Sequence, residues 1–248
     1  GKPWIVTAHD RYRKNAAIKP FRMANGSICV SEAVLSHLQG SLPDRNAVIR
    51  NGIPDLPERW QPRERENPFR FLFVGRLTHR KGVQVVLCAL APMKGKPWVL
   101  DIVGDGPQRE ELEETTKELG LGEQVRFHGF RDDVGNWMAD ADCLLFPSLD
   151  EGMPLTLMQA IKVGTPVLAS GIDPVCELVG NCENLLPAGD APAWGSRLAA
   201  VLAREVTPPR FDPGLVPTAE QMAQQTSVFL GNVVKGKTGR IPPDKKTV

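Results

Sequence analysis

The segment FRFLFVGRLTHRKGVQVVLCAL, residues 69–90, decides the fold of this chain. Five of its first six residues are apolar, which is typical of a strand buried on both faces of a parallel sheet. A polar turn then begins at Gly75, and from Val83 onward the apolar residues recur at helical spacing. A buried strand, a short turn and a helix make up half of a βαβ unit, so the segment predicts an α/β fold with a parallel sheet.

The same alternation continues to about residue 203. It predicts further strands over 98–103, 124–128, 143–146 and 167–169, and helices over 108–119, 134–139, 155–163 and 191–203. The strands are uniformly apolar, as burial on both faces demands. Residues 69–205 are therefore predicted to form a complete, doubly wound, Rossmann-like domain with helices on both faces of its sheet.

Before residue 58 the alternation is shorter. It predicts strands over 4–8, 27–30 and 47–50 and a helix over 32–38. So few residues could hardly bury a core of their own, and residues 1–57 are therefore predicted to be the C-terminal part of a larger first domain. Residues 58–68 lie in a stretch rich in proline and charge and are predicted to be a linker. Residues 206–248 hold an amphipathic segment and a tail that is predicted to be frayed.

Composition and charge exclude several classes of protein. The 30 Lys and Arg residues nearly balance the 29 Asp and Glu residues, which leaves no basic excess for binding nucleic acid. No apolar stretch approaches the roughly 20 residues that a membrane-spanning helix needs. The five cysteines form no C-x-x-C pair and lie mostly in apolar runs, which predicts buried thiols in a reducing, cytoplasmic compartment.

The sequence predicts no metal site. None of the four histidines stands four residues from another, as a helical zinc site would require. Asp140 and Asp142 form a D-x-D pair, but hard cations need several convergent oxygens, and Asp142 more plausibly completes a turn.

In doubly wound folds, ligands bind at the carboxyl ends of strands, where turns offer free backbone N–H groups. The turn after residue 74 has Gly75, which permits close approach of the backbone, and the cations Arg76, Arg80 and Lys81. Cations are unfavourable at a helix N-terminus, so their clustering predicts an anion site, with a diphosphate as the natural ligand. The alternative is a set of solvated surface cations around a turn.

Two more strand exits are informative. Residues 104–109, GDGPQR, resemble the opening of a dinucleotide fingerprint but lack its third glycine, so a tight turn explains most of the motif. After residue 146, Asp150 and Glu151 precede Gly152, and a helix follows. This helix N-terminus could face a phosphate while Glu151 accepts hydrogen bonds from hydroxyl groups. Alternatively, the two acids merely cap the helix.

Together these blocks resemble the second domain of retaining glycosyltransferase family 4, which has the GT-B fold of two Rossmann-like domains. The matching blocks are residues 73–82, 103–107, 147–155 and 164–170, followed by Glu177. Residues 6–10, 30–32 and 48–53 resemble the end of that family's first domain. Residues 220–223 resemble its C-terminal helix, which returns to the first domain. The resemblance implies a complete second domain and the end of a first domain whose beginning is missing.

The resemblance also implies roles for individual residues. Arg76 and Lys81 match the cations that hold the donor diphosphate, and Glu151 and His9 match catalytic residues at the donor sugar. The other implied donor-binding residues are Gly75, Gly104, Gly152, Met153, Pro154, Leu155 and Gln159. Where the family has a glutamate for the ribose hydroxyls, this chain has Gln159, which can hydrogen-bond but brings no charge.

The implied activity is transfer of a sugar, with retention, from a UDP- or GDP-sugar to a glycan, lipid or other conjugate, as in polysaccharide biosynthesis. Fixed cations can stabilise the departing diphosphate, so neither a metal nor another cofactor is expected. No second carboxylate is placed for a double displacement. A lipid-linked acceptor would add peripheral contact with the inner face of a membrane. Two alternatives stay open: a non-catalytic nucleotide-sugar-binding module, and another GT-B enzyme such as a sugar-nucleotide epimerase.

Overall fold

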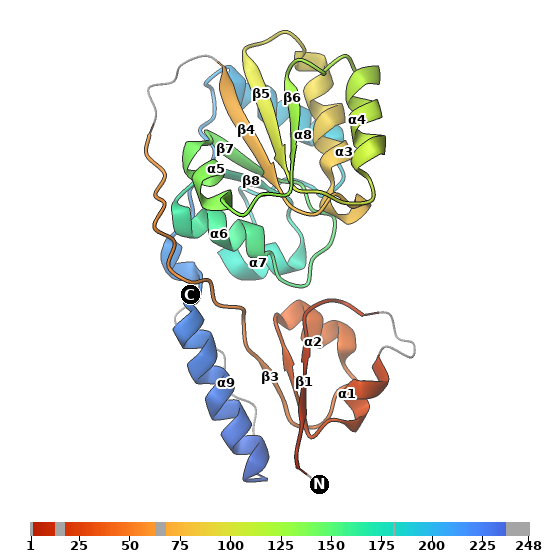
Figure 1. Cartoon of the computed structure of the whole chain (residues 1–248), viewed down its shortest axis with the longest axis vertical. Helices are drawn as coiled ribbons and strands as arrows, with labels where there is room; N and C mark the ends of the chain where they lie inside the picture. The colour runs from red at the N-terminus through yellow and green to blue at the C-terminus, as the bar shows by residue number, and fades with distance from the viewer. Residues whose placement is uncertain (1, 13–17, 63–67, 181, 237–248) are drawn as a thin grey trace.

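A computed structural model describes residues 2–12, 18–62, 68–180 and 182–236 of the chain. Two parallel sheets form two domains, one above the other in Figure 1. We call the lower one, with β1–β3, α1, α2 and α9, the first domain, and the upper one, with β4–β8 and α3–α8, the second domain.

The second domain is built on a five-stranded sheet. Its strands, in spatial order, are β6 (Val125–Gly129), β5 (Trp98–Val103), β4 (Phe69–Val74), β7 (Cys143–Phe146) and β8 (Val167–Ala169). All neighbouring strands are parallel. From β4 the chain adds strands first on one side and then on the other, which makes the boundary between β4 and β7 a topological switch point.

Helices cover both faces of this sheet (Figure 1). One face packs against α3 (Val83–Leu90), α4 (Arg109–Glu118) and α8 (Ala191–Leu202), and the other against α5 (Val134–Asp140), α6 (Leu155–Val163) and α7 (Asp173–Val179). Phe71 and Phe73 pack in the core beneath α3, α4 and α8, whereas Leu72 between them packs in the core on the other face of the sheet. This alternation explains why the strands are apolar at nearly every position, and it confirms the predicted doubly wound architecture.

The first domain has a three-stranded parallel sheet. Its strands are β1 (Ile5–Ala8), β2 (Gly26–Cys29) and β3 (Asn46–Val48), and its short helices are α1 (Lys19–Met23) and α2 (Glu32–Leu38). The long helix α9 (Ala219–Val234) lies along this sheet, with Phe229 and Val233 in a core shared with Ile28. The C-terminal segment therefore packs on the first domain, although the second domain precedes it in sequence (Figure 1).

Two segments cross between the domains and pair with each other. The Ile53 N–H donates to the Pro217 carbonyl at 3.0 Å. Within the predicted linker, the Trp60 side chain packs against the second domain, with the Arg210 guanidinium 5.0 Å from its ring centroid. Residues 63–67 of that linker lie outside the described residues.

Three of the five cysteines differ from the prediction of buried thiols. Cys176 and Cys182 form a disulfide, because α7 ends at Val179 and the chain turns back towards it. Cys88 is exposed, whereas Cys29 and Cys143 are buried. Burial raises the pKa of the Cys29 thiol to about 12 and also raises the pKa of Cys143, so neither forms a thiolate readily.

Two short helices, α1 and α7, are absent from the sequence-based prediction. The tail predicted to be frayed falls largely on residues 237–248, which lie outside the described residues. Within the described ranges, none of the helices combines the length and the apolar character that crossing a bilayer requires.

Candidate functional site

The turns that follow β4, β5 and β7 meet at one edge of the second sheet, facing the first domain (Figure 1). The Gly75 N–H donates to the Val103 carbonyl at 3.0 Å, and the Leu149 N–H donates to the Arg80 carbonyl at 2.7 Å. The turn after β4 therefore contacts both of its neighbours, and the structure brings together the three motifs singled out in the sequence.

Two glycines allow these turns to pack so closely. Gly82 has φ of +73° and Gly104 has φ of +135°, conformations that other residues rarely adopt. A Cβ atom would overlap the Pro147 carbonyl oxygen at position 82 and the Gly75 carbonyl oxygen at position 104. A side chain at either position would push two of the three turns apart.

Lys81 and Glu151 form an ion pair at the centre of the site. The Lys81 Nζ lies 2.5 Å from the Glu151 Oε1, and the Ser148 hydroxyl donates to the same oxygen at 2.8 Å. Glu151 is only 7% exposed, so the ammonium group compensates a nearly buried carboxylate. An ammonium group has three N–H donors, which leaves Lys81 able to donate to a further anion.

The other two cations of this turn have different surroundings. Arg76 is exposed, and no described residue forms an ion pair with it. Arg80 instead donates to both carboxylate oxygens of Asp10, at 2.7 and 2.9 Å, and lies 3.1 Å from Asp150. Of the three clustered cations, Arg76 and Lys81 are thus available to a ligand, whereas Arg80 is occupied by carboxylates.

His9 reaches the site from the first domain. Its carbonyl oxygen lies so close to Gly152 that a Cβ atom there would overlap it. The Ser31 hydroxyl, also from the first domain, donates to the Gly152 carbonyl at 2.8 Å. The structure therefore brings His9 against the turn that carries Glu151, although the two residues are far apart in the sequence.

The remaining donor-site residues from the prediction lie at the start of α6. Met153 and Pro154 are buried, whereas Leu155 is exposed and Gln159, one turn further along the same helix face, is half-buried. The N-cap residue of α6 is Pro154, and no side chain caps the helix. Neither of the preceding acids therefore caps this helix through a side-chain hydrogen bond.

Sequence reasoning missed one wall of a cavity beside these turns. The cavity has a volume of about 380 Å³. It is lined by Val74, Gly75, Arg76, Val103, Gly104, Asp105, Phe130, Arg131 and Val134. The last three follow β6, so the rule of inspecting every strand exit would have found them. Phe130 is 81% exposed, a further signal, because a large exposed aromatic ring beside a cavity is available to a ligand.

Ion pairs hold two of the turns around this cavity. Arg131 donates to both carboxylate oxygens of Asp133 at 2.9 Å, which lowers the pKa of Asp133. The Gly106 N–H and then Arg109 lower the pKa of Asp105. The carboxylate that lines the cavity, Asp105, is thus already hydrogen-bonded, as is Asp133 in the adjoining turn.

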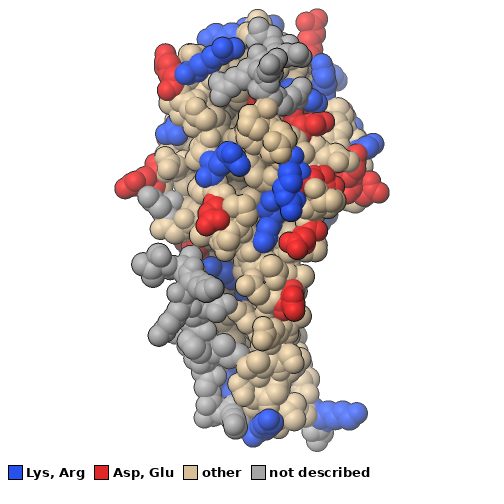
Figure 2. Space-filling view, turned by 90° about the vertical axis from the view of Figure 1, so that its left-hand side faces the viewer, with Lys and Arg blue, Asp and Glu red and all other residues tan. Residues whose placement is uncertain are grey.

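The described residues include no cluster of three or more His, Cys, Asp or Glu side chains that could hold a metal ion. Rather than completing a turn, Asp142 accepts a hydrogen bond from the Arg70 N–H of β4 at 2.8 Å, and its own N–H donates to the Arg70 carbonyl at 2.9 Å. On the face shown in Figure 2, acidic and basic side chains are interspersed over the second domain rather than gathered into one basic surface.

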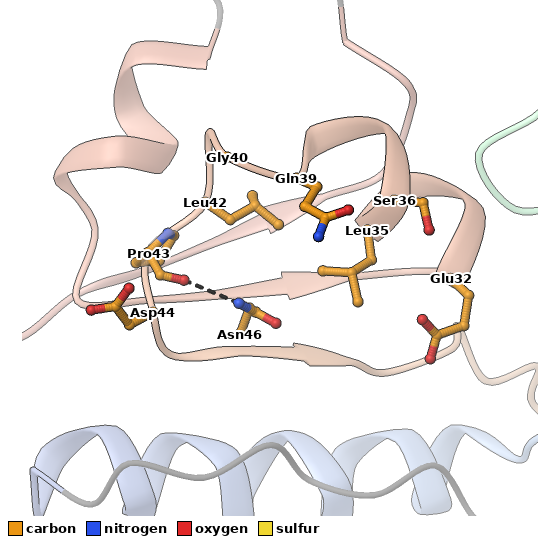
Figure 3. Close-up of a pocket in the computed structure, with 9 residues that line it drawn as sticks. All are labelled: Glu32, Leu35, Ser36, Gln39, Gly40, Leu42, Pro43, Asp44 and Asn46. Carbon is orange, nitrogen blue, oxygen red and sulfur yellow. Dashed lines mark hydrogen bonds between the residues drawn. The ribbon is translucent and has the colours of Figure 1, made fainter.

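A separate cavity of about 560 Å³ lies in the first domain, between α2 and the loop that precedes β3 (Figure 3). It is lined by Glu32, Leu35, Ser36, Gln39, Gly40, Leu42, Pro43, Asp44 and Asn46. None of the predicted site residues lines it, so it is distinct from the site at the edge of the second sheet.

Comparison with known proteins gives a consistent result. The family model for glycosyl transferases group 1 matches residues 56–225. The 2-deoxystreptamine glucosyltransferase of Streptomyces kanamyceticus is 33% identical over 217 residues, covering 83% of this chain and 55% of that protein. A putative colanic acid biosynthesis glycosyltransferase of Escherichia coli, WcaL, is 32% identical over 197 residues, covering 73% of this chain and 48% of that protein. The chain spans about half the length of these relatives.

Solved structures share the fold. Anabaena HepE, crystallised with UDP and glucose, superposes with a TM-score of 0.75 at 23% identity, covering 91% of this chain and 72% of HepE. The apo lipopolysaccharide outer core galactosyltransferase WaaB gives a TM-score of 0.67 at 23% identity, covering 86% of this chain and 62% of WaaB.

Proposed function

Because the chain belongs to the glycosyl transferases group 1 family and has the GT-B fold, we propose that it acts in sugar transfer from a nucleotide diphosphate donor. The acceptor is a glycan, a lipid or another conjugate, and transfer proceeds with retention and without a metal. The observation that carries this proposal is the meeting of Arg76, Lys81, Glu151 and His9 at the edge of the second sheet.

The donor diphosphate would bind between Arg76 and Lys81. Arg76 has no described ion-pair partner, and Lys81 is held in place by Glu151 at 2.5 Å, so neither cation must be freed before a phosphate binds. The N-terminus of α6, without a capping side chain, would add backbone N–H donors. When the bond between the sugar and the diphosphate breaks, negative charge develops on the leaving group, and these fixed donors stabilise it.

The carboxylates near this point support a reaction without a covalent sugar intermediate. Glu151 is paired with Lys81, and Asp10 and Asp150 are paired with Arg80. A nucleophilic carboxylate must approach the anomeric carbon directly, and these groups are engaged by cations. Glu151 and His9 would instead contact the donor sugar from the two sides of the boundary between the domains.

The cavity of about 380 Å³ beside Gly75 and Gly104 would hold the base of the donor. Val74, Val103 and Val134 give it an apolar lining, and Phe130 offers a ring face on which a base can stack. Gln159 on α6 would contact the ribose. UDP in the HepE crystals makes uridine the first base to test.

Calorimetric titration of the chain tests this proposal. We expect UDP, GDP or one of their sugar conjugates to bind with a micromolar to millimolar Kd that EDTA leaves unchanged. Arg76→Ala should weaken binding by about tenfold to a hundredfold, the range for lost hydrogen bonds to charged groups. Lys117→Ala is the matched control, because it removes an exposed cation paired only with Glu114 among the described residues. Absence of binding, or a requirement for Mg²⁺, would contradict the proposal.

Gln159 favours one alternative, a module that binds nucleotide sugars without turnover. Release of free UDP from UDP-glucose in the presence of candidate acceptors distinguishes the two functions, and analysis of the released sugar detects an epimerase. With a lipid-linked acceptor, we propose that the protein works in the cytoplasm at the inner face of a membrane.

A further inference from the structure

A chain of alternating charges crosses the boundary between the two domains. Asp10 and Arg11 belong to the first domain, and Arg80, Asp150 and Asp173 belong to the second. Arg80 binds Asp10 at 2.7 Å and Asp150 at 3.1 Å, whereas Arg11 binds Asp173 at 2.8 Å and lies 3.6 Å from Asp150. Three of these four contacts join one domain to the other.

Arg80 is the centre of this chain. Both of its terminal nitrogens donate to Asp10, and one of them also faces Asp150. The hydrogen bond from Arg80 lowers the pKa of Asp10. Three of the five N–H groups of this guanidinium thus face carboxylates, which also compensate its charge, although Arg80 adjoins Lys81 in the sequence.

The two carboxylates that Arg80 holds are the sequence neighbours of the two proposed catalytic residues. Asp10 follows His9, and Asp150 precedes Glu151. Asp10 also accepts a hydrogen bond from the Arg11 N–H at 2.7 Å, so its side chain is fixed to its own loop. The position of the guanidinium group therefore links the loop of His9 to the turn of Glu151.

We infer that Arg80 is a positioning residue, which sets the separation of His9 and Glu151 across the donor sugar by binding Asp10 and Asp150 together. The inference rests on the proposed function. Exposed ion pairs contribute little to stability, and Arg80 and Asp10 are 47% and 39% exposed. The consequence of losing Arg80 is therefore a misplaced His9 rather than an unfolded protein.

Hydrogen exchange of the full chain, without any ligand, tests the positioning directly. In Arg80→Ala we expect residues 8–12 to exchange at least about fivefold faster, because their loop loses one of its anchors on the second domain and keeps only those of Arg11. Arg80→Lys keeps the charge but cannot donate to both oxygens of Asp10 in the same way, so it should give an intermediate rate. Lys117→Ala should leave this segment unchanged. Unchanged exchange in Arg80→Ala would overturn the inference.

Calorimetry with UDP and UDP-glucose separates positioning from phosphate binding. Arg80→Ala should keep the affinity for UDP within about twofold but lower the affinity for UDP-glucose by about fivefold or more, because only the conjugate carries a sugar for His9 to contact. An equal loss of affinity for both ligands would show that Arg80 binds the phosphates and would overturn the inference. Unchanged affinity for both ligands would overturn it as well. If the unmodified chain binds neither, the proposed function fails, and hydrogen exchange still decides the role of Arg80.

Discussion

Replacing Lys81 with methionine should expose the energetic cost of the carboxylate at the centre of the site. Glu151 is 7% exposed, and its Oε1 accepts from both Lys81 and the Ser148 hydroxyl. Removing one partner of a fully buried ion pair costs about 3–5 kcal/mol. The Lys81 side chain is 26% exposed, so water reaches the pair, and we expect a smaller loss of about 1–3 kcal/mol.

Urea unfolding at pH 7, followed by tryptophan fluorescence, measures this loss. Trp98 and Trp194 are fully buried in the second domain, so the change in their fluorescence reports the domain that holds the pair. Lys117→Met is the control, because its exposed pair with Glu114 should contribute less than about 0.5 kcal/mol.

A second variant separates the charge from the packing. Adding Glu151→Gln to Lys81→Met removes the uncompensated charge, so the double variant should be more stable than Lys81→Met alone. This account of the pair would be refuted if Lys81→Met lost no more free energy of unfolding than the control. It would also be refuted if the loss in the double variant equalled the sum of the losses in the two single variants.

Four other predictions follow from the same geometry. Gly104→Ala should destabilise the second domain by about 2–4 kcal/mol in urea unfolding, because the backbone has φ of +135° and the added Cβ meets the Gly75 carbonyl. Acid should loosen the loop of Asp10, because the pKa of Asp10 lies below the ordinary 3.8. Its contact with Arg80 is therefore complete above about pH 4 and is lost as the pH falls through the lowered pKa. Hydrogen exchange of this loop measures the change, and Asp10→Asn should abolish it. Gln159→Glu should tighten UDP binding by about tenfold in calorimetry, because a charged acceptor replaces a neutral one. Under native, non-reducing conditions, Ellman's reagent should label Cys88 and leave the two buried thiols of the described residues unlabelled.

Much of the second domain could be predicted from the sequence because burial leaves a strong pattern there. The strands over 69–74, 98–103 and 143–146 and the helix over 155–163 have the predicted bounds, residue for residue. Each strand is apolar at all but one position at most, and a glycine or a proline follows it. Parallel strands place their carboxyl ends at one edge, so the meeting of three turns could be anticipated as well.

Short elements were harder to predict for the opposite reason. The helix α7 has only seven residues, with a proline at its second position, so few apolar residues repeat within it. The disulfide that follows joins Cys176 to Cys182, and no pattern of single cysteines reveals such a pairing before the turn between them is known. Phe130 was missed because a single exposed aromatic residue has no periodicity.

The roles of Arg76 and Arg80 show where sequence reasoning ends at this site. Both are arginines in one turn, and charge alone predicts that both bind an anion. The partners that distinguish them, Asp10 and Asp150, are about 70 residues away on either side. Asp10 reaches Arg80 because the first domain packs against the carboxyl edge of the second sheet, and Asp150 does so because the turn after β7 adjoins the turn after β4. A cation on this edge can therefore serve a ligand or the neighbouring domain, and the carboxylates within its reach decide which.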